Sequence, residues 1–196
     1  MNSATTAALP AASTREEIVR VARGLIETRS YLGFSFQDVA DKVGIRKASL
    51  YHHFPTKEAL GVEVLRTSTE NFKAWTTARI RTPEASIDAY FRMYRDALHA
   101  GSGVCPAGAL APGWDCINDD LRNAVRELRQ GQILWLTGVL GALPSGSQSS
   151  MSAVSAGALA SYVFAVCQGA SLSSRMTGQV EDFDEAIAEL RRSLAR

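Results

Sequence analysis

Apolar side chains recur at helical spacing along almost the whole chain, and this periodicity limits the possible folds more than any other feature. The first stripe begins at Ile18 and continues at intervals of three and four residues to Ile26. Similar stripes lie within residues 87–98, 121–139 and 183–194, and no segment alternates apolar and polar residues as a β-strand does. Glycines and prolines separate these stripes. We therefore predict an all-α fold of about nine helices.

Composition and charge exclude several classes of protein. Hydrophobic residues make up 46% of the 196 residues, which is enough to bury a core and excludes a chain that is disordered throughout. The formal net charge of +1 excludes a histone-like basic protein. Cys105, Cys116 and Cys167 are odd in number and widely spaced, so we expect neither a disulfide framework nor a metal pair. We predict a cytoplasmic protein without a cofactor.

Residues 130–174 contain no charged side chain and no histidine, which raises the question of a membrane span. A membrane-spanning helix needs about 20 consecutive apolar residues. Here Pro144 and a serine-rich linker near residues 145–150 interrupt the run, and serine and glycine are frequent after it. We expect buried helices and no membrane contact.

Residues 35–57 predict two short helices joined by a tight turn. Ser35 and Asp38 match a helix-capping pattern, and Thr14 with Glu17 matches the same pattern at the first helix of the chain. Gly44 is expected to end the first of the two short helices in a left-handed conformation. Ala40 is small enough for the two helices to cross closely. This arrangement is typical of a helix-turn-helix.

The second of these helices concentrates positive charge in a chain that is nearly neutral overall. Between Lys42 and Lys57 there are basic side chains and no acidic ones. Because phosphate contacts dominate affinity for DNA, the pattern favours insertion into the major groove. The alternatives are a solvated basic face and a helix-turn-helix that binds protein.

The segment resembles the N-terminal domain of the TetR family of bacterial one-component regulators, and the match covers residues 14–65. The residues that carry the resemblance are Phe36, Val39, Ala40, Val43, Gly44, Leu50, Tyr51, His53, Phe54, Lys57 and Leu60. It implies a three-helix DNA-binding domain at 14–60 and a helical-bundle domain for ligand binding and dimerisation at 61–196. It also implies one long helix from Lys57 to Arg79. Residues 1–13 carry no charged side chain and lack the features of a signal peptide, so we predict a flexible tail there.

The resemblance implies that Lys47, Ser49 and His52 face the bases of a near-palindromic operator. It implies that the phosphates are contacted mainly by Ser35, Gln37, Tyr51, His53 and Lys57. Arg46 is a further basic candidate on the same segment. His52 and His53 have no third ligand nearby in the sequence, so we expect no metal site.

The C-terminal part contains all three tryptophans and several other aromatic residues on helical stripes. These positions are consistent with a packed core or with a cavity for a small apolar or aromatic effector. The candidate pocket residues are Phe72, Trp75, Tyr90, Met93, Tyr94, Cys105, Leu110, Trp114, Trp135, Phe164 and Gln168. The segment 101–110 resembles the turn that opens the sixth helix of many family members, which places Cys105 near a helix N-terminus.

We predict a transcriptional repressor that an effector releases from its operator. The alternative is a repressor that senses oxidants or electrophiles through the thiol of Cys105. Against it, most free cysteines have a packing role, no basic residue lies within several residues of Cys105, and Pro106 removes one amide donor. Small residues within 151–174, together with the amphipathic segment 181–195, predict a homodimer. No arrangement of residues typical of an active site is present in the sequence, so we do not expect an enzyme.

Overall fold

The computed structural model describes residues 13–78, 82–102, 104–143 and 155–195. The N-terminal elements are α1 (Thr14–Arg29), the 3-10 turn η1 (Tyr31–Gly33), α2 (Phe36–Val43) and α3 (Lys47–His53). The remaining elements are α4 (Lys57–Thr77), α5 (Pro83–His99), α6 (Pro106–Ala109), η2 (Ala111–Cys116), α7 (Asp119–Gly141), α8 (Ala156–Thr177) and α9 (Glu181–Ala195). No strand occurs within these ranges, which confirms the predicted all-α class.

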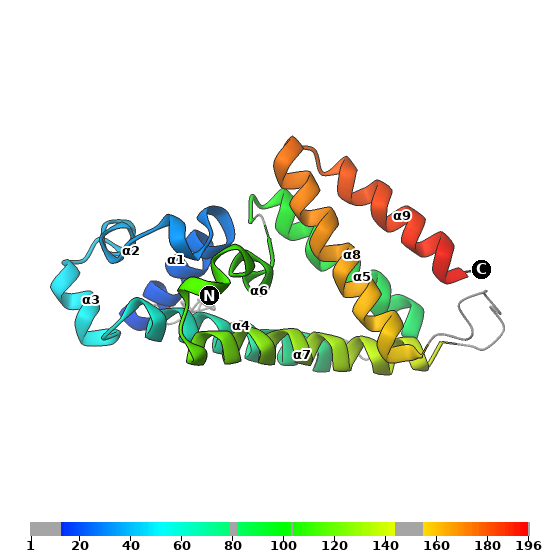
Figure 1. The fold of residues 1–196 in the computed structure, drawn as a ribbon, viewed down its shortest axis with the longest axis horizontal. Helices are drawn as coiled ribbons and strands as arrows, with labels where there is room; N and C mark the ends of the chain where they lie inside the picture. Colours follow the sequence, from blue (N-terminus) through cyan, green and yellow to red (C-terminus); the bar gives the residue numbers. More distant parts are fainter. Residues whose placement is uncertain (1–12, 79–81, 103, 144–154, 196) are drawn as a thin grey trace, which may run out of the picture.

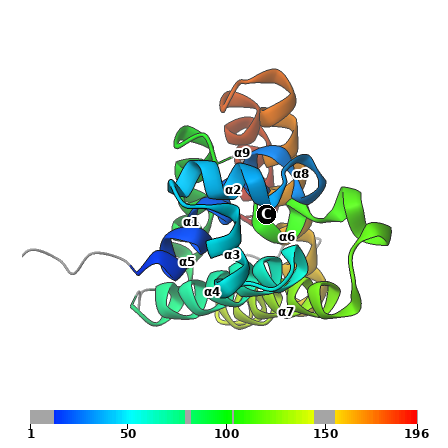
Figure 2. The ribbon, with the colours of Figure 1, turned by 90° about the vertical axis from the view of Figure 1, so that its left-hand side faces the viewer.

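The helix-turn-helix and the last two helices lie at opposite ends of an elongated molecule. Helices α4 and α7 run side by side along its length (Figure 1). Helices α2 and α3 form the tip at one end, and α8 and α9 lie toward the other. Seen along the long axis, α2 and α3 face the viewer in front of the other helices (Figure 2). The long helix predicted from Lys57 is α4, although it ends at Thr77.

The beginning of α1 differs from the expectation by one residue. The Ser13 hydroxyl accepts a hydrogen bond from the backbone N–H of Glu16 at 3.3 Å, and the Glu16 carboxylate accepts one from the Ser13 N–H at 2.8 Å. This reciprocal pair is a capping box, so Ser13 is the cap and Thr14 is the first helical residue. Ser13, the last residue of the predicted tail, therefore caps α1, and residues 1–12 of that tail lie outside the described ranges.

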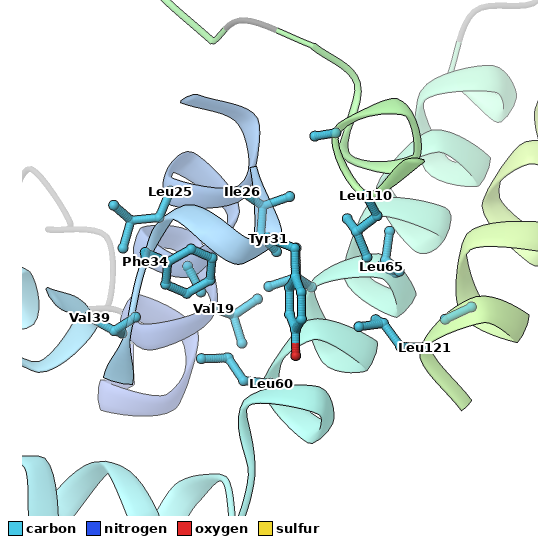
Figure 3. Packing of buried hydrophobic residues seen from close by; sticks show 14 of the residues in the cluster. Val19, Leu25, Ile26, Tyr31, Phe34, Val39, Leu60, Leu65, Leu110 and Leu121 are labelled. Carbon is cyan, nitrogen blue, oxygen red and sulfur yellow. The ribbon is translucent and has the colours of Figure 1, made fainter. Parts of the chain in front are cut away.

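The hydrophobic core consists of two clusters of buried residues. The first combines α1–α3 with the start of α4, with α6 and with the start of α7, so Ile26, Leu65, Leu110 and Leu121 share one cluster (Figure 3). The second joins α5, α7, α8 and α9. The first cluster crosses the domain boundary predicted at residue 60. Helix α1 is therefore packed directly against α6, and α4 packs against both α6 and α7.

Helix α8 is, among the described residues, the one helix that is long and apolar enough to cross a membrane by length and composition. Its inner face is buried in the second cluster against neighbouring helices. Its outer face carries a helical stripe of exposed, uncharged residues, namely Ala158, Tyr162, Ala165, Gly169, Leu172 and Met176. Packing within a bundle accounts for the apolar inner face, and the outer stripe is a surface suited to a partner helix.

Candidate functional site

Local interactions form the helix-turn-helix as predicted. The Ser35 hydroxyl accepts from the Asp38 N–H at 3.3 Å, and the Asp38 carboxylate accepts from the Ser35 N–H at 2.7 Å, which together cap α2. Gly44 ends α2 in the left-handed region at φ 78°. The Ala40 carbonyl accepts from the N–H groups of both Gly44 and Ile45, at 2.9 and 3.0 Å. Ala40 is fully buried, as close helix crossing requires.

Helix α3 has a buried face and an exposed face. Leu50 and Phe54 are buried in the first cluster. The side chains of the predicted DNA-binding residues Arg46, Lys47, Tyr51 and His52 are exposed, and those of Ser49 and His53 are half-buried. The structure thus brings these candidates together on one surface at the tip of the molecule.

Tyr51 is held in place although half of its surface is exposed. Its ring packs against Phe36 of α2 with 5.1 Å between ring centroids. This contact restricts the side chain and leaves it on the surface of α3. A phenol fixed in this way is suited to donate to a phosphate without a large loss of side-chain entropy.

Charge on this surface is uncompensated. Among the described residues, no carboxylate lies within ion-pair distance of Lys42, Arg46 or Lys47. In contrast, the two candidates at the start of α2 are already hydrogen-bonded within the protein. The Ser35 hydroxyl donates to the Asp38 carboxylate, and the Gln37 amide donates to the Asp41 carboxylate at 2.7 Å. The free positive charge therefore lies at the end of α2 and the start of α3.

Lys57 is oriented differently from the other candidates. Its ammonium points inward and donates to the carbonyl oxygens of Tyr31 and Phe34, at 2.6 and 2.5 Å. It also lies over both aromatic rings, at 4.5 and 4.2 Å from the centroids. Burial lowers the pKa of this ammonium below its usual value. Lys57 thus holds η1 and the loop before α2 against the start of α4, and its contact with a phosphate stays a prediction.

A cavity of about 210 Å³ lies between α1, α4, α5, α7 and the turn that precedes α6. The predicted pocket residues that line it are Phe72, Trp75, Met93, Tyr94 and Cys105. The sequence analysis did not identify its other lining residues, namely Arg23, Glu27, Ser68, Asn71, Ala97, Ser102, Val104, Pro106, Leu128 and Gln132. Arg23 and Glu27 come from α1, so part of the wall belongs to the DNA-binding region.

The other predicted pocket residues lie elsewhere. Leu110 is fully buried in the first cluster and does not line this cavity, which corrects its assignment. Tyr90 is also fully buried, and Trp135 packs against Trp75 with 5.4 Å between centroids. Trp114, Phe164 and Gln168 line a separate groove on the other side of α6.

A chain of hydrogen bonds runs through the wall of the cavity to Cys105. The Gln168 amide donates to the Tyr94 hydroxyl at 3.1 Å, and Tyr94 donates to the Gln132 carbonyl oxygen at 3.2 Å. The Gln132 amide in turn donates to the sulfur of Cys105 at 3.7 Å. Burial raises the pKa of the Tyr94 hydroxyl well above its usual value. In the sequence, Gln132 is a polar residue within the otherwise apolar stripe of residues 121–139. Its position there is the sequence signal that could have indicated this network.

The described residues contain no group of three or more His, Cys, Asp or Glu side chains that could hold a metal ion. His52 and His53 lie on the α3 surface without such partners.

Comparison with known proteins supports this geometry. Residues 18–64 match the model described as bacterial regulatory proteins, tetR family. Over 190 residues the chain is 23% identical to the HTH-type transcriptional repressor NemR of Escherichia coli (strain K12), covering 93% of this chain and 94% of NemR. The sequence similarity to that repressor therefore extends over nearly the whole length of both chains.

Solved structures show the same fold over nearly the whole chain. A TetR-family regulator from Agrobacterium tumefaciens is 27% identical and superimposes with a TM-score of 0.83, covering 92% of this chain and 97% of that one. The reduced form of E. coli NemR is 22% identical and gives a TM-score of 0.76, covering 91% and 95% of the two chains. The chain thus carries a segment that matches the tetR-family model and has, over nearly its whole length, the fold of TetR-family transcriptional regulators.

Proposed function

We propose that the protein is a cytoplasmic homodimeric repressor that binds a near-palindromic operator and is released by a small apolar or aromatic effector. The observation that carries the proposal is the surface of α3, where basic side chains without carboxylate partners lie at the tip of a TetR fold. In a symmetric dimer two such surfaces would enter successive major grooves about 34 Å apart.

The side chains of this surface suit two kinds of contact. Lys47, Ser49 and His52 are assigned to the base edges, and the exposure of Lys47 and His52 on α3 supports this assignment. Tyr51, with its ring fixed on Phe36, is placed to donate to a phosphate. Ser35, Gln37, Arg46 and His53 surround them and complete the surface.

We call the cavity of about 210 Å³ the effector cavity. An effector bound in it could change the position of the DNA-binding region. Arg23 and Glu27 of α1 form an ion pair at 2.7 Å and line the cavity together with Phe72 and Trp75 of α4. An effector that fits the cavity better when α1 is displaced would favour a spacing of the two α3 helices that does not match DNA. The coupling needed is modest, since about 1–3 kcal/mol changes affinity by about 5- to 150-fold.

The test measures binding of the purified protein to labelled duplexes that tile the DNA beside its own gene. Binding is detected by fluorescence anisotropy at fixed salt concentration. We expect tight binding to one near-palindromic duplex. Lys47→Ala is expected to weaken this binding by about 1–3 kcal/mol and to reduce discrimination against a mismatched duplex, because a base contact is lost. Lys73→Ala, which removes an exposed lysine of α4, is the matched control. Equal losses on specific and random DNA would contradict base readout by Lys47.

A second candidate function, sensing of oxidants or electrophiles through Cys105, is favoured by the position of that thiol. Cys105 lines the effector cavity, is partly exposed and accepts a hydrogen bond from Gln132. The other cysteines differ, because Cys116 lies outside the cavity lining and burial raises the pKa of Cys167 far above its usual value. The hydrogen bond from Gln132 holds the Cys105 sulfur at the wall of the cavity.

Alkylation kinetics at pH 7 test this candidate. We expect iodoacetamide to modify Cys105 about tenfold faster than the exposed Cys116, and Gln132→Leu to slow Cys105 without affecting Cys116. The rates are measured by peptide mass spectrometry. A Cys105 that reacts no faster than Cys116 would remove thiol sensing while leaving the effector-released repressor intact.

A further inference from the structure

A second and larger cavity lies between α6, η2, α7 and α8, beside the C-terminal end of α1. Its volume is about 650 Å³, within the range of about 300–1,000 Å³ that is usual for small-molecule sites. We call it the α6–α8 groove. Most of its lining is apolar, including Val104, Ala107, Val125, Phe164 and Leu172. The α6–α8 groove is separate from the effector cavity, although Val104 lines both.

Three arginines line this apolar groove, and none of its lining residues is acidic. Most described arginines form an ion pair with a carboxylate. Within the described residues, the arginines without such a partner are Arg46, Arg92, Arg126, Arg129 and Arg175. Arg46 belongs to the DNA surface, and Arg126, Arg129 and Arg175 all line the groove. Uncompensated positive charge is therefore gathered at this groove as it is on α3.

The contacts of the three arginines are with neutral groups. Arg126 lies over the Trp114 ring at 5.3 Å and donates to the Asn123 side chain, and Arg129 lies over the Phe164 ring at 5.5 Å. Arg175, near the end of α8, donates to the backbone carbonyls of Glu27 and Thr28. Stacked or carbonyl-bound guanidinium groups retain their charge and donors for an anion.

We propose that the α6–α8 groove binds a small amphipathic anion, with its apolar body along Val125 and Phe164 and its carboxylate or phosphate head at the arginines. Charge complementarity argues for this occupant. An apolar partner helix would place three unpaired guanidinium groups in a low-dielectric contact, which is costly, whereas an anionic head satisfies them. Gly169 and Leu172 also belong to the exposed stripe of α8, so coverage by a second copy of the chain is the competing occupant.

The position of Arg175 gives the bound anion a path to the DNA-binding region. The carbonyls that Arg175 holds belong to the last turn of α1. A carboxylate is a stronger acceptor than a carbonyl, so an anion in the groove would draw Arg175 away and loosen the contact between α8 and α1. This site adds a second input to the repressor, beside the effector cavity.

Calorimetric titration of the full-length protein with decanoate, kept below its micelle-forming concentration, tests the proposal. We expect decanoate to bind about tenfold or more tightly than the uncharged 1-decanol, because hydrogen bonds to charged groups are the stronger ones. The double variant Arg126→Gln/Arg129→Gln is expected to erase this preference. Arg92→Gln, which removes an arginine without a carboxylate partner elsewhere on the surface, is expected to leave it unchanged. Equal binding of decanoate to the double variant and the wild type would overturn the proposal.

Tryptophan fluorescence locates the bound anion. Trp114 lines the groove and Trp75 lines the effector cavity. In a Trp75→Phe/Trp135→Phe variant, decanoate is expected to change the emission of Trp114. In a Trp114→Phe/Trp135→Phe variant it is expected to leave that of Trp75 unchanged. The reverse pattern would place decanoate in the effector cavity and overturn the proposal.

Light scattering of the double arginine variant distinguishes the competing occupant. We expect the dimer of the double variant to dissociate over the same range of protein concentration as the wild-type dimer. Weakened dimerisation together with absent decanoate binding to the wild type would identify the groove as a subunit contact and overturn the proposal. None of these measurements uses DNA. A negative result for decanoate binding would therefore not contradict the proposed repressor function.

Discussion

Replacement of Ala165 by glutamate is expected to convert the dimer into a monomer and to weaken operator binding by about 10²- to 10⁴-fold. Ala165 lies at the centre of the exposed α8 stripe, where a symmetric interface would bring two copies of the new carboxylate together in an apolar contact. A monomer holds one half-site, so it loses the effective concentration that links the two contacts. Light scattering measures the mass, and anisotropy measures affinity for the operator.

Ala74→Glu is the matched control for this prediction. Ala74 is also an exposed alanine within a helix, although it lies on α4 rather than on the stripe. We expect this variant to remain a dimer with affinity close to that of the wild type. An Ala165→Glu protein that stays dimeric and binds the operator normally would refute the assignment of the interface to α8.

Lys57→Met is expected to lower the free energy of unfolding by about 1.5–3 kcal/mol in the absence of DNA. The substitution removes both hydrogen bonds to the Tyr31 and Phe34 carbonyls and the contacts with their rings. Because methionine keeps an unbranched apolar side chain, the main loss is the charged donor. Urea unfolding measures the effect, and Lys73→Met on the exposed side of α4 is the control.

The same variant separates a structural role from a phosphate contact. A lysine that mainly contacts a phosphate would leave the unfolding free energy unchanged and would reduce the salt dependence of DNA binding by about one unit when removed. We expect the opposite result for Lys57. An unchanged unfolding curve with a smaller salt slope would restore Lys57 to the DNA surface.

The helix-turn-helix could be predicted from the sequence because short-range interactions determine it. The capping pair Ser35 and Asp38, the left-handed Gly44 and the small Ala40 are each separated by a few residues and act locally. The exposed positions of Lys47 and Tyr51 follow from the helical period once Leu50 is buried. At the start of α1 two adjacent residues, Ser13 and Thr14, carry a hydroxyl that could cap the helix. Backbone geometry determines that Ser13 is the cap, and the sequence pattern does not resolve that geometry.

The placement of the pocket residues could not be predicted in the same way. Aromatic stripes indicated that Trp75 and Tyr94 face the interior, but the same pattern placed Leu110 beside them, although it belongs to the core. Arg23 and Glu27 carried no signal of a cavity, because their helix is distant in sequence from α4 and α5. Packing between distant helices decides which inward-facing residues border empty space.

The sequence by itself determined the helical class, the helix-turn-helix and the side chains of its exposed face, because caps, turns and the 3.6-residue period act over a few residues. The tertiary structure decided the inward course of Lys57, the contribution of α1 to the effector cavity and the gathering of Arg126, Arg129 and Arg175 at one groove. Each of these depends on which helices pack together, and that is set by the burial of apolar surface over the whole chain rather than by local spacing.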